Sequence, residues 1–204
     1  MDSPTPDRYV GKYSIGSVRI LTITRDGEQL SAQISGQPTL PIYPEMPPKF
    51  RWRTINAQVT FAIENGRPAT NATIHQGGGD IVATRLDETA TRSIEAKFAS
   101  RIRDQLPQPA SEAAVQKFFA AMSAGTPNYG DMTDALRDVL RRQLSVIAAR
   151  AQGIRSVKFK GVSEVGADSY IVTYQDGQQS HCLIDLDSDG KIALLALLPK
   201  FSYL

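Results

Sequence analysis

The residues of this chain that could act as nucleophiles or bases are few. Its 204 residues include one cysteine, Cys182, and two histidines, His75 and His181. Cys182 directly follows His181 in a strand-like segment, and neighbouring side chains of a strand point to opposite faces. We therefore do not expect a Cys–His nucleophile and base. His75 lies in the string His75-Gln-Gly-Gly78 and is predicted either to contribute to a binding site or to be a structural histidine at a strand end.

Two spacings near the C-terminus imitate functional motifs. Ser188 and Lys191 are three residues apart, as in hydrolases whose lysine activates a serine on one helical turn. Asp189-Gly190 between them favours a hairpin turn instead. Asp185–Gly190 also matches the front half of a calcium loop, but the twelfth position is Ala196 where that loop needs a bidentate glutamate. We expect no catalytic residue, no metal and no cofactor.

Residues 9–87 are predicted to form an all-β domain. Short segments that alternate or are rich in β-branched residues follow one another, and glycine turns such as Asp26-Gly27 separate them. About eight short strands without a helix favour a small antiparallel barrel of the lipocalin-like kind. Prolines crowd residues 38–48, which we expect at a sheet edge or in a rim loop because proline cannot donate to a ladder.

The barrel interior is the first place to look for a ligand site. Trp52, the single tryptophan, lies between Arg51 and Arg53. If the arginines face solvent, Trp52 faces inward, where it either packs in the core or stacks on a ligand. Tyr43 and Gln58 are predicted to be its polar-tipped neighbours in the lumen. Barrels of this size are often filled by side chains, so a cavity is a hypothesis.

The rest of the chain changes character. Residues 1–8 are expected to be a flexible leader or the start of a fragment of a longer protein, and they lack the basic and apolar regions of a signal peptide. Residues 88–107 contain apolar residues at helical spacing and predict a connector helix. Residues 108–204 predict an α+β domain of two helices and a four-strand antiparallel meander. Ser111 is the expected N-cap of the first of these helices, and Asp131 the start of the second.

Several strings resemble one family. Tyr9-Val-Gly-Lys-Tyr13, Asn56-Ala-Gln-Val-Thr-Phe61 and His75-Gln-Gly-Gly78 resemble a small all-β domain often fused C-terminal to serine β-lactamase-like, penicillin-recognising hydrolases. Ser156-Val-Lys-Phe-Lys-Gly-Val162 resembles the domain that often ends those hydrolases, with a fold similar to cystatin-like or nuclear-transport-factor-like cones. The resemblance implies a non-catalytic accessory region that serves a serine hydrolase domain in cis or in trans, by assisting oligomerisation or access to the active site. By analogy it also implies a periplasmic or secreted location.

Two other functions remain open. The chain could be a stand-alone protein that binds a small apolar ligand through Tyr43, Trp52, Gln58 and His75. Alternatively, Asp168 and Tyr170 could act as the carboxylate and hydroxyl of an isomerase in the α+β cone. The formal charge of +2, without a basic stripe, does not favour nucleic acid as a partner, and no apolar run is long enough to span a membrane. A homo-oligomer is compatible with the sequence.

Overall fold

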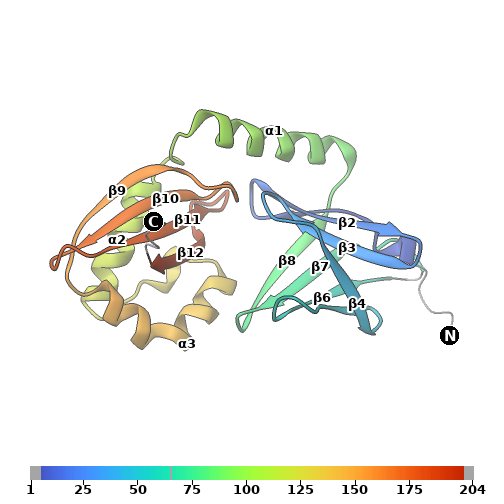
Figure 1. Cartoon of the computed structure of the whole chain (residues 1–204), viewed down its shortest axis with the longest axis horizontal. Coiled ribbons are helices and arrows are strands. Elements are labelled where there is room, and N and C mark those ends of the chain that lie inside the picture. Colours follow the sequence, from blue (N-terminus) through green and yellow to red (C-terminus); the bar gives the residue numbers. More distant parts are fainter. Residues whose placement is uncertain (1–5, 65, 200–204) are drawn as a thin grey trace. The chain divides into compact units, whose positions relative to one another are not determined.

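A computed structural model describes residues 6–64 and 66–199, and it divides the chain into two compact units, Met1–Ser100 and Arg101–Leu204. Residues 1–5 of the expected leader lie outside the described residues. Within the described residues, the first unit contains a closed antiparallel barrel of eight strands, and the second contains helices and a four-strand antiparallel sheet (Figure 1). The prediction of a barrel followed by an α+β unit is therefore confirmed.

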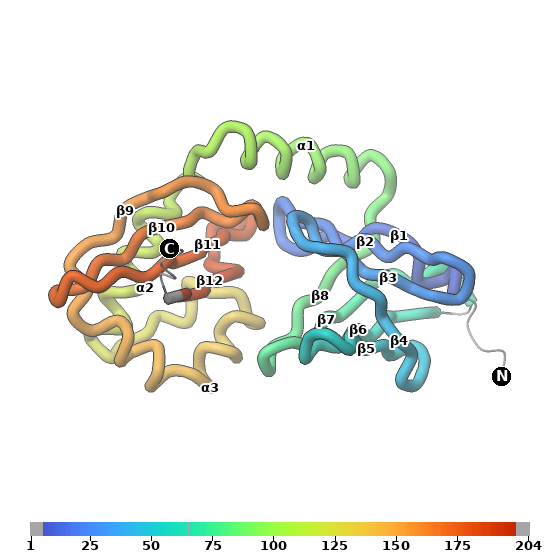
Figure 2. Tube along the Cα trace, in the orientation of Figure 1, coloured from blue at the N-terminus to red at the C-terminus, as the bar shows by residue number. Residues whose placement is uncertain are grey.

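The barrel strands follow one another around the barrel in chain order, and β1 closes it by pairing with β8 (Figure 2). A short 3-10 helix, Pro6–Arg8, precedes them. The strands are β1 Gly11–Ile15, β2 Arg19–Asp26, β3 Gln29–Ile34, β4 Leu40–Met46, β5 Lys49–Trp52, β6 Ala57–Ala62, β7 Asn71–Gln76 and β8 Gly79–Arg85. The β2–β3 hairpin turns at Gly27, whose φ of 55° suits glycine.

Side chains fill the barrel interior. Alternate residues of the strands point inward, and an aromatic cluster occupies part of the core. The Phe61 ring centroid lies 4.9 Å from that of Tyr9, 5.7 Å from Phe50 and 6.0 Å from Tyr13. These separations are typical of packed aromatic pairs, so the centre of the barrel is a hydrophobic core.

The proline-rich segment is placed partly as predicted, because Pro38, Pro47 and Pro48 lie in the connections on either side of β4. The other two prolines lie within a paired strand. β4 contains Pro41 and Pro44 yet pairs on both sides, with β3 and β5, because a closed barrel has no edge. The ladder between β3 and β4 has only three residue pairs, and the ladder between β4 and β5 shifts register after Pro44. A short ladder and a bulge accommodate residues that lack a donor N–H.

Two buried tyrosines of the barrel have opposite hydrogen-bonding situations. The Tyr13 hydroxyl donates to the backbone oxygen of Tyr9 at 2.7 Å and accepts from Arg85 Nη2 at 2.9 Å. The Tyr9 hydroxyl is buried without a hydrogen-bond partner among the described residues. Burial raises the pKa of both phenols, so both remain neutral at neutral pH.

Removing the two hydroxyls should therefore have opposite effects. Tyr9→Phe should raise the free energy of unfolding by about 1 kcal/mol, because it removes a polar group that is desolvated without compensation. Tyr13→Phe should lower it by about 2 kcal/mol, because Arg85 loses an acceptor. Chemical denaturation followed by the fluorescence of Trp52 measures both. Equal destabilisation by the two changes would contradict the prediction.

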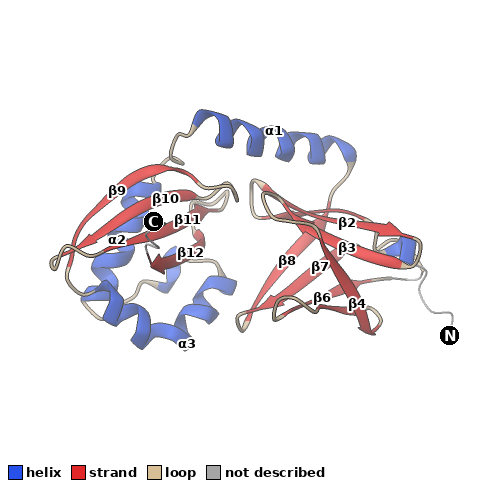
Figure 3. Ribbon diagram, viewed as in Figure 1, coloured by secondary structure: helices blue, strands red, loops and turns tan. Residues whose placement is uncertain are grey.

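The second unit stacks helices on one face of its sheet (Figure 3). Helix α1, Glu88–Asp104, begins in the first unit, and its last residues belong to the second. The sheet order is β12-β11-β10-β9. The other elements are α2 Ser111–Ser123, a 3-10 turn at Tyr129–Asp131, α3 Asp134–Ala151, β9 Ile154–Val162, β10 Asp168–Tyr174, β11 Gln179–Leu186 and β12 Ile192–Pro199.

The helix starts of this unit differ from the predictions. The N-cap of α2 is Ala110, with a left-handed φ of 66° and no side-chain cap, and Ser111 is already helical. The Ser111 hydroxyl lies 2.7 Å from the Tyr170 hydroxyl, so it is used by the core rather than by the helix end. Helix α3 begins after Thr133, whose side chain accepts from the Leu136 N–H, whereas Asp131 lies in the 3-10 turn.

Candidate functional site

The structure does not gather the four predicted ligand-binding residues in a barrel lumen. Trp52 is 5% exposed and belongs to the core. Tyr43 and Gln58 lie beside the inward-facing Ile42 and Val59, so strand alternation directs them outward. The prediction that they share a lumen with Trp52 is wrong for this reason. Their ligand binding stays a prediction, now for the outer surface.

Tyr43, Gln58 and His75 instead lie in one row on the outer face. Strand register pairs Tyr43 with Arg51, Arg51 with Gln58 and Gln58 with His75. The Gln58 amide donates to Glu45 at 3.2 Å, and the Arg53 guanidinium lies 3.8 Å from the centre of the Tyr43 ring. A polar row that crosses four strands thus includes three of the predicted residues. We call it the outer row.

His75 sits in a chain of hydrogen bonds at the end of the outer row. Its Nδ1 lies 2.7 Å from Asp80 Oδ1, and its Nε2 lies 3.0 Å from the Thr60 hydroxyl. Thr60 is on β6, His75 on β7 and Asp80 on β8. The sequence analysis missed Thr60 and Asp80, because their proximity to His75 depends on the register of three strands.

An apolar pocket of about 210 Å³ opens in the second unit, between α2, the 3-10 turn and the start of β12. Its apolar lining combines large core side chains with small residues of α2 and of its N-cap. The large ones are Phe118, Met122, Met132 and Ile192, and the small ones are Ala110, Ala113, Ala114 and Ala121. The alanines leave space beside the large side chains, and this space contributes to the hollow.

Three polar side chains border this pocket. The Lys117 ammonium lies 2.7 Å from Asp131 Oδ2, to which the Asn128 amide also donates at 2.9 Å. The charges of Lys117 and Asp131 neutralise each other, and Lys117 and Asn128 are exposed. An apolar cavity with a few convergent polar groups is the usual form of a small-molecule site.

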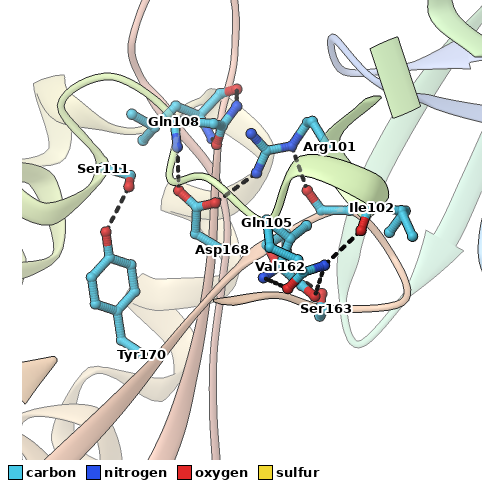
Figure 4. Close-up of polar contacts among 12 residues, drawn as sticks. Arg101, Ile102, Gln105, Gln108, Ser111, Val162, Ser163, Asp168 and Tyr170 are labelled. Atoms are coloured by element: carbon cyan, nitrogen blue, oxygen red, sulfur yellow. Dashed lines mark hydrogen bonds and ion pairs between the residues drawn. The ribbon is translucent and has the colours of Figure 1, made fainter. Parts of the chain in front are cut away.

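Asp168 anchors a buried polar network in the same unit (Figure 4). The carboxylate is 0% exposed and accepts from Arg101 Nη2 at 2.6 Å and from the Gln108 backbone N–H at 2.8 Å. Arg101 Nε donates to the Gly166 carbonyl at 2.9 Å. Both carboxylate oxygens are therefore bonded to residues that join the end of α1 to the sheet.

Tyr170 is engaged in a similar way. It is fully buried, its hydroxyl bonds to Ser111, and burial raises its pKa. Neither Tyr170 nor Asp168 lines the apolar pocket described above. Their contacts are those of a structural network, which gives the isomerase hypothesis no open site at these two residues.

The remaining motif candidates lie in structural positions. Ser188 and Lys191 are in the β11–β12 turn, where Asp187 Oδ1 accepts from the backbone N–H groups of Asp189 and Lys191, each at 2.9 Å. Cys182 is fully buried, and burial raises the pKa of its thiol to about 12, so a thiolate nucleophile does not form at neutral pH.

In comparisons with known proteins, no family model, no curated protein and no solved structure matches the chain. Within residues 6–64 and 66–199, no cluster of three or more potential metal-binding side chains occurs. Over the same residues, none of the helices has the length and apolar character needed to cross a bilayer.

Proposed function

We propose that the chain is a non-catalytic binding protein whose α+β unit takes a small, neutral, mainly apolar ligand. The main support for this proposal is the pocket lined by Phe118, Met132 and the alanines of α2. Its volume of about 210 Å³ is below the range of roughly 300–1,000 Å³ typical of drug-sized ligands. A neutral ligand is favoured because Lys117 and Asp131 already pair with each other.

The finer fold assignment belongs to this proposal. We infer that the barrel is lipocalin-like and that the second unit is a cystatin-like cone, because helices cover one face of its antiparallel sheet. The barrel interior is occupied by aromatic rings, which supports the α+β unit as the ligand-binding part. A polar head that reaches Asn128 would orient the ligand at the pocket border.

The resemblance to the C-terminal region of serine β-lactamase-like hydrolases supports a second candidate, an accessory module for such an enzyme. The order of barrel, helix and α+β unit is the order that the resemblance implies. The module would serve the hydrolase in cis or in trans, in a periplasmic or secreted setting. Reading the coding sequence upstream of codon 1 tests the cis form: an in-frame Ser-x-x-Lys domain supports it, and an immediate stop codon contradicts it.

Filling the pocket should abolish ligand binding. n-Hexanol, an apolar chain with one hydroxyl, is the probe, and amide chemical shifts of Asn128 and Gly190 report on its binding. The wild-type chain should show saturable shifts. Ala114→Leu should weaken this binding at least tenfold, because the larger side chain occupies the space beside Phe118.

The matched control makes the same change on the exposed face of the same helix. Ala120 is exposed and does not line the pocket, so Ala120→Leu should leave the hexanol titration unchanged. Shifts that do not saturate in the wild-type chain would contradict the ligand-binding proposal. Equal loss of binding in both variants would contradict the assignment of the pocket.

A further inference from the structure

We propose that Thr60 is an acyl-acceptor site, activated by His75 and Asp80, that reacts with activated acyl esters. The Thr60 hydroxyl lies 3.0 Å from His75 Nε2, and His75 Nδ1 lies 2.7 Å from Asp80 Oδ1. This is the order of contacts by which a hydroxyl, an imidazole and a carboxylate generate a nucleophile. The site lies on the barrel and does not depend on the pocket of the α+β unit.

The Asp80 carboxylate determines which ring nitrogen of His75 carries the proton. A carboxylate can only accept, so Nδ1 of the neutral imidazole donates to Asp80. Nε2 then presents its lone pair and accepts from the Thr60 hydroxyl. The imidazole is in this way oriented as a general base toward a single neighbouring hydroxyl.

The local sequence places the three residues on one face. Gln58 and Thr60 are two residues apart on β6, and both alternate with the inward-facing Val59 and Phe61. His75 pairs with Gln58 on one side and with Asp80 on the other, so Thr60 is its diagonal neighbour. The His75 and Asp80 side chains are 33% and 64% exposed, and a small reagent can therefore reach the site from solvent.

The reaction is a simple acyl transfer. Thr60 Oγ attacks the carbonyl carbon of the ester as its proton passes to His75 Nε2. The bond from that carbon to the leaving oxygen breaks, and His75 returns the proton to the leaving alcohol or phenol. The products are an ester of Thr60 and the free alcohol or phenol, and no oxidant, reductant or metal takes part.

The exposure of the site decides which acyl donors react. Because the site is open to solvent, the oxyanion that develops on the ester carbonyl is stabilised less than it would be in an enclosed site. Aryl esters are therefore the expected donors, because their leaving groups depart with little assistance. The expected result is stoichiometric modification of Thr60 with slow subsequent hydrolysis, which is compatible with a protein that otherwise binds ligands.

The experiment uses p-nitrophenyl acetate and the full chain, with peptide mass mapping over time. Thr73 is the internal control, because it lies directly across from Thr60 on the neighbouring strand and outside the His75–Asp80 chain of hydrogen bonds. Hydroxylamine separates the two kinds of product, since it removes an acetyl ester of threonine but not an acetyl amide of Lys49 or another lysine.

In the wild-type chain, Thr60 should acquire a hydroxylamine-labile acetyl group roughly 100-fold faster than Thr73, the range of general base assistance. His75→Gln should remove this advantage. Asp80→Asn should reduce it, because the amide donates to Nδ1 and leaves Nε2 protonated toward Thr60. Asp80→Glu, which keeps a carboxylate on this positioning residue, should restore part of the rate.

Two results would overturn the proposal: acetylation of Thr60 no faster than that of Thr73, or a rate at Thr60 that His75→Gln leaves unchanged. Denaturation midpoints of each variant, followed by Trp52 fluorescence, establish that the barrel is folded during the reaction. Thr60→Val supplies the background, because it retains the β-branched shape and lacks the hydroxyl.

Discussion

Asp168→Ala should lower the free energy of unfolding of the α+β unit by about 3–5 kcal/mol, the cost of breaking a buried ion pair from one side. The carboxylate is fully buried and the Arg101 side chain is 14% exposed. Removal of Asp168 leaves the Arg101 guanidinium desolvated without a counter-charge. It also removes the acceptor of the Gln108 backbone N–H.

The conservative change separates the charge from the hydrogen bond. Asp168→Asn retains an oxygen that can accept from Gln108 but no longer neutralises Arg101, so it should cost less than Asp168→Ala. Asp138 on α3, whose side chain is 56% exposed, is the control, and Asp138→Ala should change stability by less than about 0.5 kcal/mol. Hydrogen exchange of the backbone amides of β10 and β11 measures the free energy of unfolding of this unit in each variant.

A loss below about 1 kcal/mol for Asp168→Ala would mean that solvent reaches the Arg101–Asp168 pair. A large loss of unfolding free energy in Asp168→Ala would show that the network around Asp168 stabilises the fold. Two glutamines add to it: Gln105 accepts from the Val162 N–H at 2.8 Å, and Gln108 accepts from the Leu186 N–H at 3.0 Å. The segment between α1 and α2 is thereby bonded to the strand ends on which an isomerase site would have been built.

The sequence predicts the elements well because their signals are local. Alternation and glycine turns identify the eight barrel strands, and helical spacing identifies α1, α2 and α3. The error at Ser111 has a tertiary cause: a serine before a helix is a good cap, but the Tyr170 hydroxyl, which is 59 positions away, binds it instead.

The sites are harder to predict because they depend on register and on distant segments. Strand alternation places Tyr43 and Gln58 on the face opposite to the buried Ile42 and Val59. The alternation of apolar and polar residues in the sequence could therefore have indicated that both face outward. Contact between Thr60 and His75 requires the β6–β7 pairing. The apolar pocket joins α2 to the start of β12, and no pattern within either segment indicates this approach.

The second large effect concerns the barrel interior. Phe61→Ala should lower the free energy of unfolding of the barrel by about 3–5 kcal/mol. The side chain is 1% exposed and contacts the rings of Tyr9, Phe50 and Tyr13. Its removal loses both transfer free energy and packing with three neighbours, and it leaves a cavity. Val82, which is 62% exposed on β8, is the control, and Val82→Ala should cost less than about 0.5 kcal/mol.

The same variant tests whether the barrel is itself a ligand-binding cavity. An apolar cavity created in a core stays dry and can bind benzene. Benzene should therefore stabilise Phe61→Ala against denaturation, as reported by Trp52, the single tryptophan, which lies in the barrel core. The wild-type barrel should show no such shift because its aromatic rings already fill the space. Equal stabilisation of both proteins would mean that the native barrel has a cavity, and the ligand site would then have to be sought beside Trp52 rather than in the pocket beside α2.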